Sequence, residues 1–230
     1  MKKTQFIILV VLLIGFVTVS HAQRRPHGIV PIKNGIGIEG GITQFDILTD
    51  NFETKRGNGW LGGASATVDI PHKWYNISYT IQLSENTVGI SARPFDLATT
   101  NEFIDYKLFT AQIMLKAHVK IIQSYLTLDV GPMLQYNGEL ELKEDKYKGY
   151  LINNYDALLA EDVSDISKLN FNGTIGLSAG ISHFRLKAQY IYGFTNMLNK
   201  LNKNDLSVGT NTDKFKGNQS MMVFTLMITL

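Results

Sequence analysis

The 230-residue chain contains no cysteine and shows no excess of charge of one sign. Without cysteine it is neither a disulfide-stapled scaffold nor an envelope lipoprotein, which is attached to lipid through a cysteine. Its 22 basic and 20 acidic residues exclude a typical nucleic-acid binder, which carries a strong basic excess. Phosphate-loop, zinc-ligand and nucleophile-elbow motifs are also missing. The sequence therefore predicts no cofactor, no metal site and no nucleic-acid partner.

Long apolar runs are absent as well, apart from one at the N-terminus, residues 6–19, which follows Lys2 and Lys3. This run is shorter than the about 20 residues of a spanning helix. Ser20 and Ala22 stand three and one positions before a cleavage site, the pattern of a secretory signal; an uncleaved anchor is the alternative. Removing the signal takes away two lysines and leaves a net charge of zero. We expect a signal peptide over 1–22, a periplasmic segment over 23–34 and a barrel domain over 35–230.

The rest of the chain is rich in apolar and polar residues that alternate with a period of two. In the clearest segment, 169–182, Phe171, Ile175 and Leu177 have one parity, while Asn172 and Ser178 have the other. Such alternation predicts strands with one apolar and one polar face. Eight segments show it: 35–43, 60–70, 74–83, 106–119, 125–136, 169–182, 185–194 and 220–230.

The connections between these segments alternate in length. Long polar connections cover 48–59, 92–105, 142–168 and 195–218, and short ones cover 71–73, 120–124 and 182–184. Short turns at one end and long loops at the other are typical of outer-membrane barrels. We therefore predict an all-β fold: an eight-stranded antiparallel up-and-down transmembrane β-barrel with long external loops and short periplasmic turns.

A soluble lipocalin-like barrel would also show this alternation, but the composition of the two faces favours the membrane. The polar face is mostly Gly, Ser, Thr, Asn and Gln, which suits a narrow lumen, whereas a face toward bulk water is usually dense in Lys and Glu. The apolar face carries Tyr79, Tyr190, Tyr192 and Phe109, as an interfacial aromatic girdle does. We predict export to the cell outer membrane, with outer-membrane lipid and, during insertion, the barrel-assembly machinery as partners.

The chain ends on an apolar segment whose outward parity is Phe224, Leu226, Ile228 and Leu230. In lipid the last strand has to pair with the first, because unpaired backbone groups find no water there. We expect this segment to be the closing strand. It also resembles the terminal signal of barrel assembly, with Leu230 in the place of the usual aromatic.

Residues 103–140 contain Met114-Leu115-Lys116, then Gly131-Pro132 followed by Tyr136. This stretch resembles the central hairpin of the PorT-like outer-membrane β-barrel family of Bacteroidetes. That family often carries a proline early in the first of these strands, and 109–111 has none. The resemblance implies an integral outer-membrane protein and no single shared biochemical activity.

Five charged residues have the polar parity and are expected to face the lumen: Glu39, Asp69, Lys116, Asp129 and Lys187. Charges in a confined interior have to be paired, so a neutralising network is the favoured interpretation. An ion path or a small-ligand site is the alternative. With three acids and two bases, the predicted network is slightly acidic.

A catalytic interpretation rests on His118, His183 and Ser182 near the short turns, as in an outer-membrane lipid hydrolase. Ser182 and His183 are neighbours in a strand and therefore point to opposite faces, and no third orienting group is evident. Interfacial histidines at turns are the favoured interpretation, so no catalytic residue is assigned and the protein is predicted not to be an enzyme.

The external loops are the other candidate site, because function often lies on loops held by a rigid scaffold. Loop 144–165 carries Tyr147, Tyr150 and Tyr155, the aromatic type that protein interfaces favour. The sequence thus predicts a structural or binding role carried by the loops, with an external or envelope protein as partner. A lipid-modifying enzyme and a narrow channel are the alternatives; the channel is disfavoured because side chains fill an eight-stranded interior.

Overall fold

The computed structural model describes residues 33–70, 72–95, 101–209 and 213–230. These belong to the unit Pro31–Leu230. The predicted signal peptide and nearly all of the predicted N-terminal segment lie outside the described residues. Among those residues no helix is long and apolar enough to cross a membrane.

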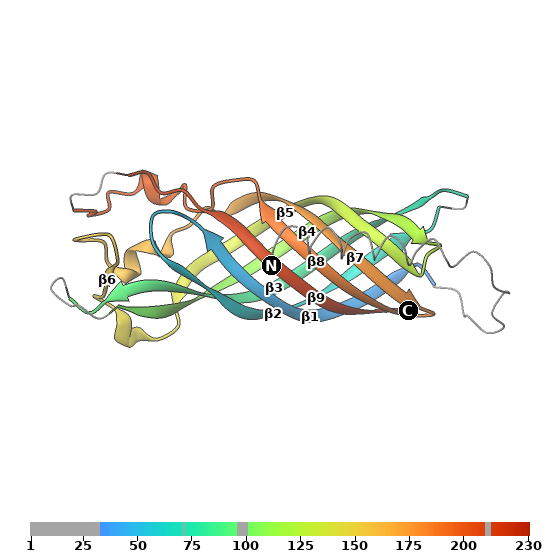
Figure 1. Ribbon diagram of the computed structural model, residues 1–230, viewed down its shortest axis with the longest axis horizontal. Helices are drawn as coiled ribbons and strands as arrows, with labels where there is room; N and C mark the ends of the chain where they lie inside the picture. The colour runs from blue at the N-terminus through green and yellow to red at the C-terminus, as the bar shows by residue number, and fades with distance from the viewer. Residues whose placement is uncertain (1–32, 71, 96–100, 210–212) are drawn as a thin grey trace, which may run out of the picture. The chain divides into compact units, whose positions relative to one another are not determined.

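Eight antiparallel strands form a closed ring (Figure 1). They are β1 (Ile36–Leu48), β2 (Thr54–Val68), β3 (Tyr75–Arg93), β4 (Glu102–Ile122), β5 (Leu126–Leu142), β7 (Leu169–Ile181), β8 (Phe184–Gly193) and β9 (Asn218–Thr229). Each pairs with its neighbours in chain order, and β9 returns to β1. The predicted all-β up-and-down barrel is confirmed.

A two-residue strand and three short 3₁₀ helices lie in the two long connections. Strand β6 (Leu151–Ile152) pairs with the end of β3, and the helices are η2 (Asp145–Tyr147), η3 (Ala160–Ser164) and η4 (Leu201–Lys203). The described parts of these connections, 143–168, 194–209 and 213–217, are therefore folded structure at one end of the barrel (Figure 1).

The apolar C-terminal segment is the strand that closes the ring. Its register with β1 runs from Gly37↔Thr229 to Leu48↔Asn218, and it pairs with β8 on its other side. Because β9 is paired on both sides, the barrel has no open edge at the point where the chain ends.

The predicted facing also holds over the half of the barrel nearest the short turns. Along β3, Tyr79, Ile81 and Leu83 point outward and are about half exposed, while Thr80 and Gln82 are buried in the lumen. The barrel therefore has an apolar exterior and a polar interior in this half.

Two of the predicted long connections are shorter than expected. Most of 48–59 and the ends of 92–105 belong to strands, which leaves 49–53 and 94–101 as the connections. Gly57 and Gly59 give the first stretch a loop-like composition, yet both lie in β2, where a Cβ would collide with the backbone carbonyls of β3. They are thus sites of close strand approach, and the register of β2 shifts between Arg56 and Gly59.

Several strands are longer than predicted, and their apolar residues change from outward to inward positions as the strands leave the short-turn half. In β3 the outward residues change from Leu83 to Glu85 and Thr87, and the inward residues change from Asn86 to Val88 and Ile90. The other long strands do the same: inward-facing Phe45 and Ile47 end β1, and Tyr106 and Leu108 begin β4. The loop-end half of the barrel is therefore polar outside and apolar inside.

The two long connections complete this apolar interior. Side chains from both pack with the inward residues of the strands in one buried cluster, which includes Ile152, Tyr155, Leu158, Val163, Ile166, Met197, Leu198, Leu201 and Phe215. We call these folded segments, 143–168, 194–209 and 213–217, the cap. Tyr106 on β4 donates a 2.8 Å hydrogen bond to the carbonyl of Ala160, and this contact fastens the cap to the barrel wall.

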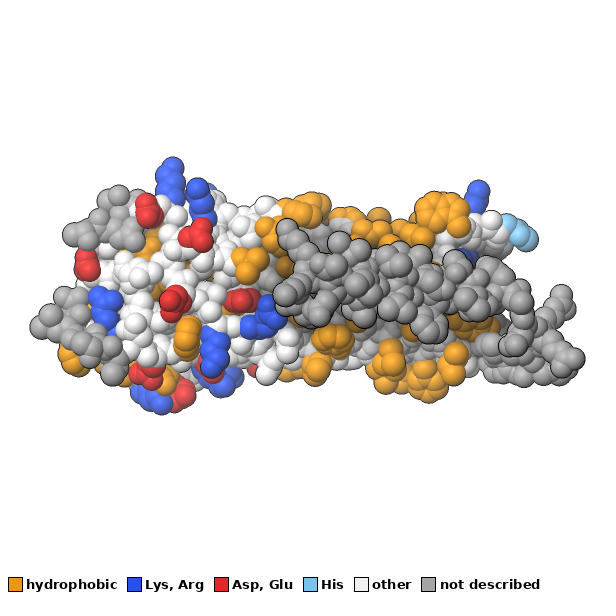
Figure 2. All heavy atoms as spheres, viewed as in Figure 1, with side chains coloured by type: hydrophobic (Ala, Val, Ile, Leu, Met, Phe, Trp, Pro, Cys, Tyr) orange, Lys and Arg blue, Asp and Glu red, His pale blue; other side chains and the backbone are white. Residues whose placement is uncertain are grey.

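The space-filling view shows the two halves from outside. On the face in Figure 2, hydrophobic side chains gather over the short-turn half, and most Lys, Arg, Asp and Glu side chains gather over the half that bears the cap. Toward the cap, the interior thus changes from polar to apolar, and the surface changes from apolar to charged.

Candidate functional site in the barrel lumen

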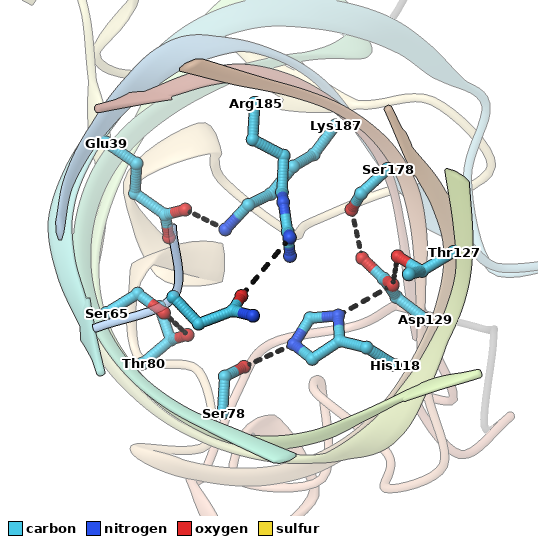
Figure 3. A network of polar contacts seen from close by, with 11 residues as sticks. Glu39, Ser65, Ser78, Thr80, His118, Thr127, Asp129, Ser178, Arg185 and Lys187 are labelled. Carbon is cyan, nitrogen blue, oxygen red and sulfur yellow. Dashed lines mark hydrogen bonds and ion pairs between the residues drawn. The ribbon is translucent and has the colours of Figure 1, made fainter. Parts of the chain in front are cut away.

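The short-turn half of the lumen holds an ion pair between Glu39 of β1 and Lys187 of β8. The ammonium Nζ lies 2.5 Å from Glu39 Oε2, and both side chains are buried. Gln82 of β3 donates to the other carboxylate oxygen, Oε1. Figure 3 shows the Glu39–Lys187 pair. Both oxygens of Glu39 are therefore satisfied, as a buried carboxylate requires.

Across the lumen, Asp129 of β5, His118 of β4 and Ser78 of β3 form a chain of hydrogen bonds (Figure 3). Asp129 Oδ1 lies 2.7 Å from His118 Nδ1, and His118 Nε2 lies 2.7 Å from Ser78 Oγ. A carboxylate only accepts, so Nδ1 carries the proton, and a neutral ring then leaves Nε2 to accept from the serine hydroxyl. This is the order of contacts in a Ser–His–Asp triad.

Asp129 is held by two more donors. Thr127, on the same face of β5, donates to Oδ1 at 2.7 Å, and Ser178 of β7 donates to Oδ2. The carboxylate is fixed from three strands and is saturated with hydrogen bonds. It can therefore keep the His118 ring in one orientation.

Two cations complete the lumen charges. Lys116 of β4 is fully buried, and its ammonium has no hydrogen-bond partner among the described residues. Arg185 of β8 donates through Nη2 to Asn34 at 3.4 Å, and its Nη1 has no partner there either. Both lie within electrostatic reach of Asp129, and Lys116 also of Glu39.

Toward the cap, a cluster of side-chain amides fills the lumen. Gln135 of β5 bonds to Gln112 of β4, Asn137 of β5 and Gln219 of β9, with distances between 2.6 and 3.2 Å. This cluster lies between the charged residues and the apolar core of the cap. The amide cluster and the apolar core of the cap fill the lumen at their own levels, which argues against a conducting path.

Four of the five charges predicted for the lumen lie there: Glu39, Lys116, Asp129 and Lys187. Asp69 does not, and this expectation was wrong. Strand β2 ends at Val68, and the Asp69 side chain is 54% exposed and pairs with Lys120 at 3.3 Å at the barrel end. The expected set of lumen charges also lacked Arg185, the first residue of the predicted strand 185–194 and the second residue of β8. With two acids and three bases, the network is basic.

One of the two histidines also lies elsewhere than expected. His118 had been interpreted as interfacial, but it is buried in the lumen between Ser78 and Asp129. His183 does lie at a short turn, where its Nδ1 is 2.9 Å from the Oγ of Ser182. The serine that contacts a buried histidine is therefore Ser78 of β3. No sequence motif indicates the register of β3 with β4.

The loop tyrosines separate into two groups. Tyr155 is buried in the cap, where it stacks on Phe215 at 5.6 Å between ring centroids and accepts a hydrogen bond from Asn51. Tyr147 and Tyr150 stay partly exposed and meet edge to face at 5.3 Å. Only these two have the position expected of a contact surface.

No metal centre is apparent in the part of the chain that the structure describes, because no three His, Asp or Glu side chains there are grouped to hold an ion.

The fold and its lumen define a small closed antiparallel β-barrel with an apolar exterior, a hydrogen-bonded interior and a folded cap. No family model matches the chain, and no curated protein matches it. Among solved structures, it is similar to the crystal structure of Neisserial surface protein A (NspA), with 12% sequence identity and a TM-score of 0.46. The match covers 86% of this chain and 98% of that one.

Proposed function

We propose that the chain is an integral outer-membrane β-barrel whose cap protrudes from the membrane and carries a structural or binding role. The observation that carries this proposal is the exposed apolar belt on the short-turn half. Along β3 the outward apolar residues run from Tyr75 to Leu83. At about 3.3 Å per residue and a tilt near 40°, nine residues span roughly 23 Å, close to the apolar band of about 25 Å on such barrels.

The distribution of charge supports the same placement. Soluble proteins rarely expose so large a contiguous apolar surface, whereas a bilayer needs one. Acidic and basic side chains at the cap end, such as Glu85, Lys107 and Glu141, belong in water. The predicted export signal and the long connections favour an outer membrane with the cap facing outward. The hairpin at 103–140 supports kinship with the PorT-like family.

A binding role is the better of the structural and binding alternatives for the cap. Its chain is fixed by buried side chains, so its outer surface is ordered before any partner arrives, which lowers the entropic cost of binding. Tyr147 and Tyr150 provide a half-exposed aromatic pair at this surface, flanked by Lys146 and Lys148. We propose an external or envelope protein as the partner.

Single-cysteine labelling tests the placement. Because the chain has no native cysteine, only the introduced cysteine can react. Lys148→Cys in the cap should react with a membrane-impermeant maleimide on intact cells. Lys73→Cys at a short turn should react only after the outer membrane is opened. The opposite pattern would refute the orientation, and recovery of the protein in the soluble fraction would refute the membrane placement.

A second candidate function is acyl-ester hydrolysis, favoured by the Ser78–His118–Asp129 chain. In this mechanism His118 Nε2 takes the Ser78 proton as Oγ bonds to the carbonyl carbon. The ester C–O bond then breaks as the proton passes to the leaving alcohol, and water releases the acyl group by the same route. Ser78 is only 1% exposed, and the cap closes one end, so substrate would enter from the short turns.

Activity-based labelling decides this second candidate. The folded barrel is treated with a small fluorophosphonate, with Ser78→Ala and Ser178→Ala as paired variants. Both serines are buried and hydrogen-bonded, but only Ser78 meets the Nε2 that would act as base. Labelling that is lost in Ser78→Ala alone supports the hydrolase. No labelling of the folded wild-type protein refutes it and leaves the chain as a structural network.

A further inference from the structure

We propose that the lumen binds one small monovalent anion, of the size of chloride, beside the Lys116 ammonium. The argument begins with the count of buried charge. Lys116, Lys187 and Arg185 are cations, and Glu39 and Asp129 are the buried carboxylates that face them. With His118 neutral, one positive charge is left without a counter-charge in a confined interior, where an unpaired charge is costly.

The missing counter-charge belongs to Lys116 on grounds of geometry. Glu39 uses both carboxylate oxygens on Lys187 and Gln82, and Asp129 uses both of its oxygens on neutral or histidine donors. An ammonium has three donors, yet Lys116 Nζ has no acceptor within hydrogen-bond distance among the described residues, and the residue is 0% exposed. It is therefore a fully buried cation with an incomplete shell.

Three other unpaired buried groups in this half of the lumen can also donate hydrogen bonds. Arg185 Nη1 and Gln189 Nε2 on β8 and Thr225 Oγ1 on β9 lack partners in the described part of the chain. Thr225 is in register with Lys187, and Val223 with Gln189, so these groups share the wall that faces Lys116. A surplus of donors calls for an acceptor. An anion supplies both the acceptor and the charge, whereas water supplies only the acceptor.

The size of the ligand follows from the packing of the lumen. An eight-stranded barrel has an interior that side chains just fill, and here the amide cluster around Gln135 and the core of the cap fill the other half. A halide taken from the surrounding solution is small enough to fit among side chains. Gluconate is too large, so it serves as the non-binding reference anion.

The test measures thermal unfolding of the purified folded barrel in detergent by heat-modifiable gel migration. Chloride and bromide are compared with gluconate at equal ionic strength. A bound halide should raise the midpoint temperature, and the rise should saturate with halide concentration. Lys116→Met should abolish this rise. Lys120→Met, a change on the same strand at the end of the barrel, where Lys120 pairs with Asp69, should keep it.

Anomalous scattering from bromide-soaked crystals gives a second readout that needs no variant. A bromide peak within contact distance of Lys116 Nζ supports the site even if Lys116→Met does not fold. Equal midpoints in all three salts, with no bromide peak in the lumen, would overturn the proposal and leave Lys116 uncharged or hydrated by water alone.

Discussion

Placing the same charge on two outward positions of β3 tests whether the bilayer stops where the alternation inverts. Ile81 lies in the apolar belt, and its side chain is 49% exposed. Thr87 points outward on the same strand, three outward positions further toward the cap, beyond Glu85. If the membrane covers only the belt, Ile81→Arg puts a cation in hydrocarbon, whereas Thr87→Arg puts it in water.

The expected magnitudes differ enough to be measured. An arginine near the bilayer midplane destabilises a barrel by about 2–4 kcal/mol, and one near the interface by about 0–1 kcal/mol. Thr87 is in register with Lys107, so a like-charge pair adds up to about 1 kcal/mol there. At about 1.4 kcal/mol per tenfold, Ile81→Arg should lower the folding equilibrium constant by roughly 30- to 700-fold.

The assay is urea-dependent folding into lipid vesicles, followed by heat-modifiable migration and by the fluorescence of Trp60 and Trp74. The comparison should be repeated in detergent, whose polar headgroups lie close to every belt position. There the difference between the two variants in lost folding free energy should become smaller. Equal losses for Ile81→Arg and Thr87→Arg in vesicles would refute the membrane boundary. A larger loss for Thr87→Arg would place Thr87, and not Ile81, in the hydrocarbon.

Three further changes test the ring, the cap core and the cap surface. Phe224→Asp should prevent the heat shift on gels, because it sets a carboxylate on the lipid face of β9, while Thr225→Asp, one residue later and facing the lumen, should keep part of it. Ile90→Ala should cost about 2–5 kcal/mol in urea titrations, because Ile90 is buried in the apolar core of the cap half. Lys200 donates a 2.6 Å hydrogen bond to Asp165 and holds the pKa of that carboxyl below its usual range. This contact stabilises the cap above pH about 4 and is lost as the pH falls through the lowered pKa. The protection factors of amides in 195–209, which are exchange rates corrected for the intrinsic effect of pH, should therefore fall in acid and should already be low at pH 7 in Asp165→Asn.

The strands and their facing could be predicted because the side-chain period of a strand is two, and one face of this sheet is apolar. The same reasoning failed where the environment of the strand changes. Leu108 and Phe109 are adjacent and both apolar, since the first faces the cap core and the second faces outward in the belt. A search for one continuous phase stops at such a change: the predicted strand 74–83 ends at Leu83, whereas β3 continues to Arg93. The missed signal was the switch of the apolar residues from the outward to the inward parity, which the longer β1, β3 and β4 all contain.

The lumen residues could be predicted only one strand at a time. Parity alone places Glu39, Lys116 and Lys187 inside, but it cannot show which carboxylate meets which ammonium across a ring. His118 and Asp129 face each other across the hairpin at 123–125, so that pair was within reach of the sequence. Ser78 was not, because β3 and β4 are joined by a long connection whose length does not fix their register.

One closed backbone serves both halves of the barrel. Every strand of the ring is paired on both sides, so it needs neither water nor lipid to satisfy its backbone along the paired length. Side chains alone decide which solvent each segment tolerates, and in the proposed placement the inverted alternation is enough to carry the same strand from lipid into water. The protruding half then resembles a soluble barrel whose open mouth has to be covered. The cap covers it with Tyr155, Phe215 and Leu158, because apolar side chains such as Val88 and Ile90 would otherwise face water.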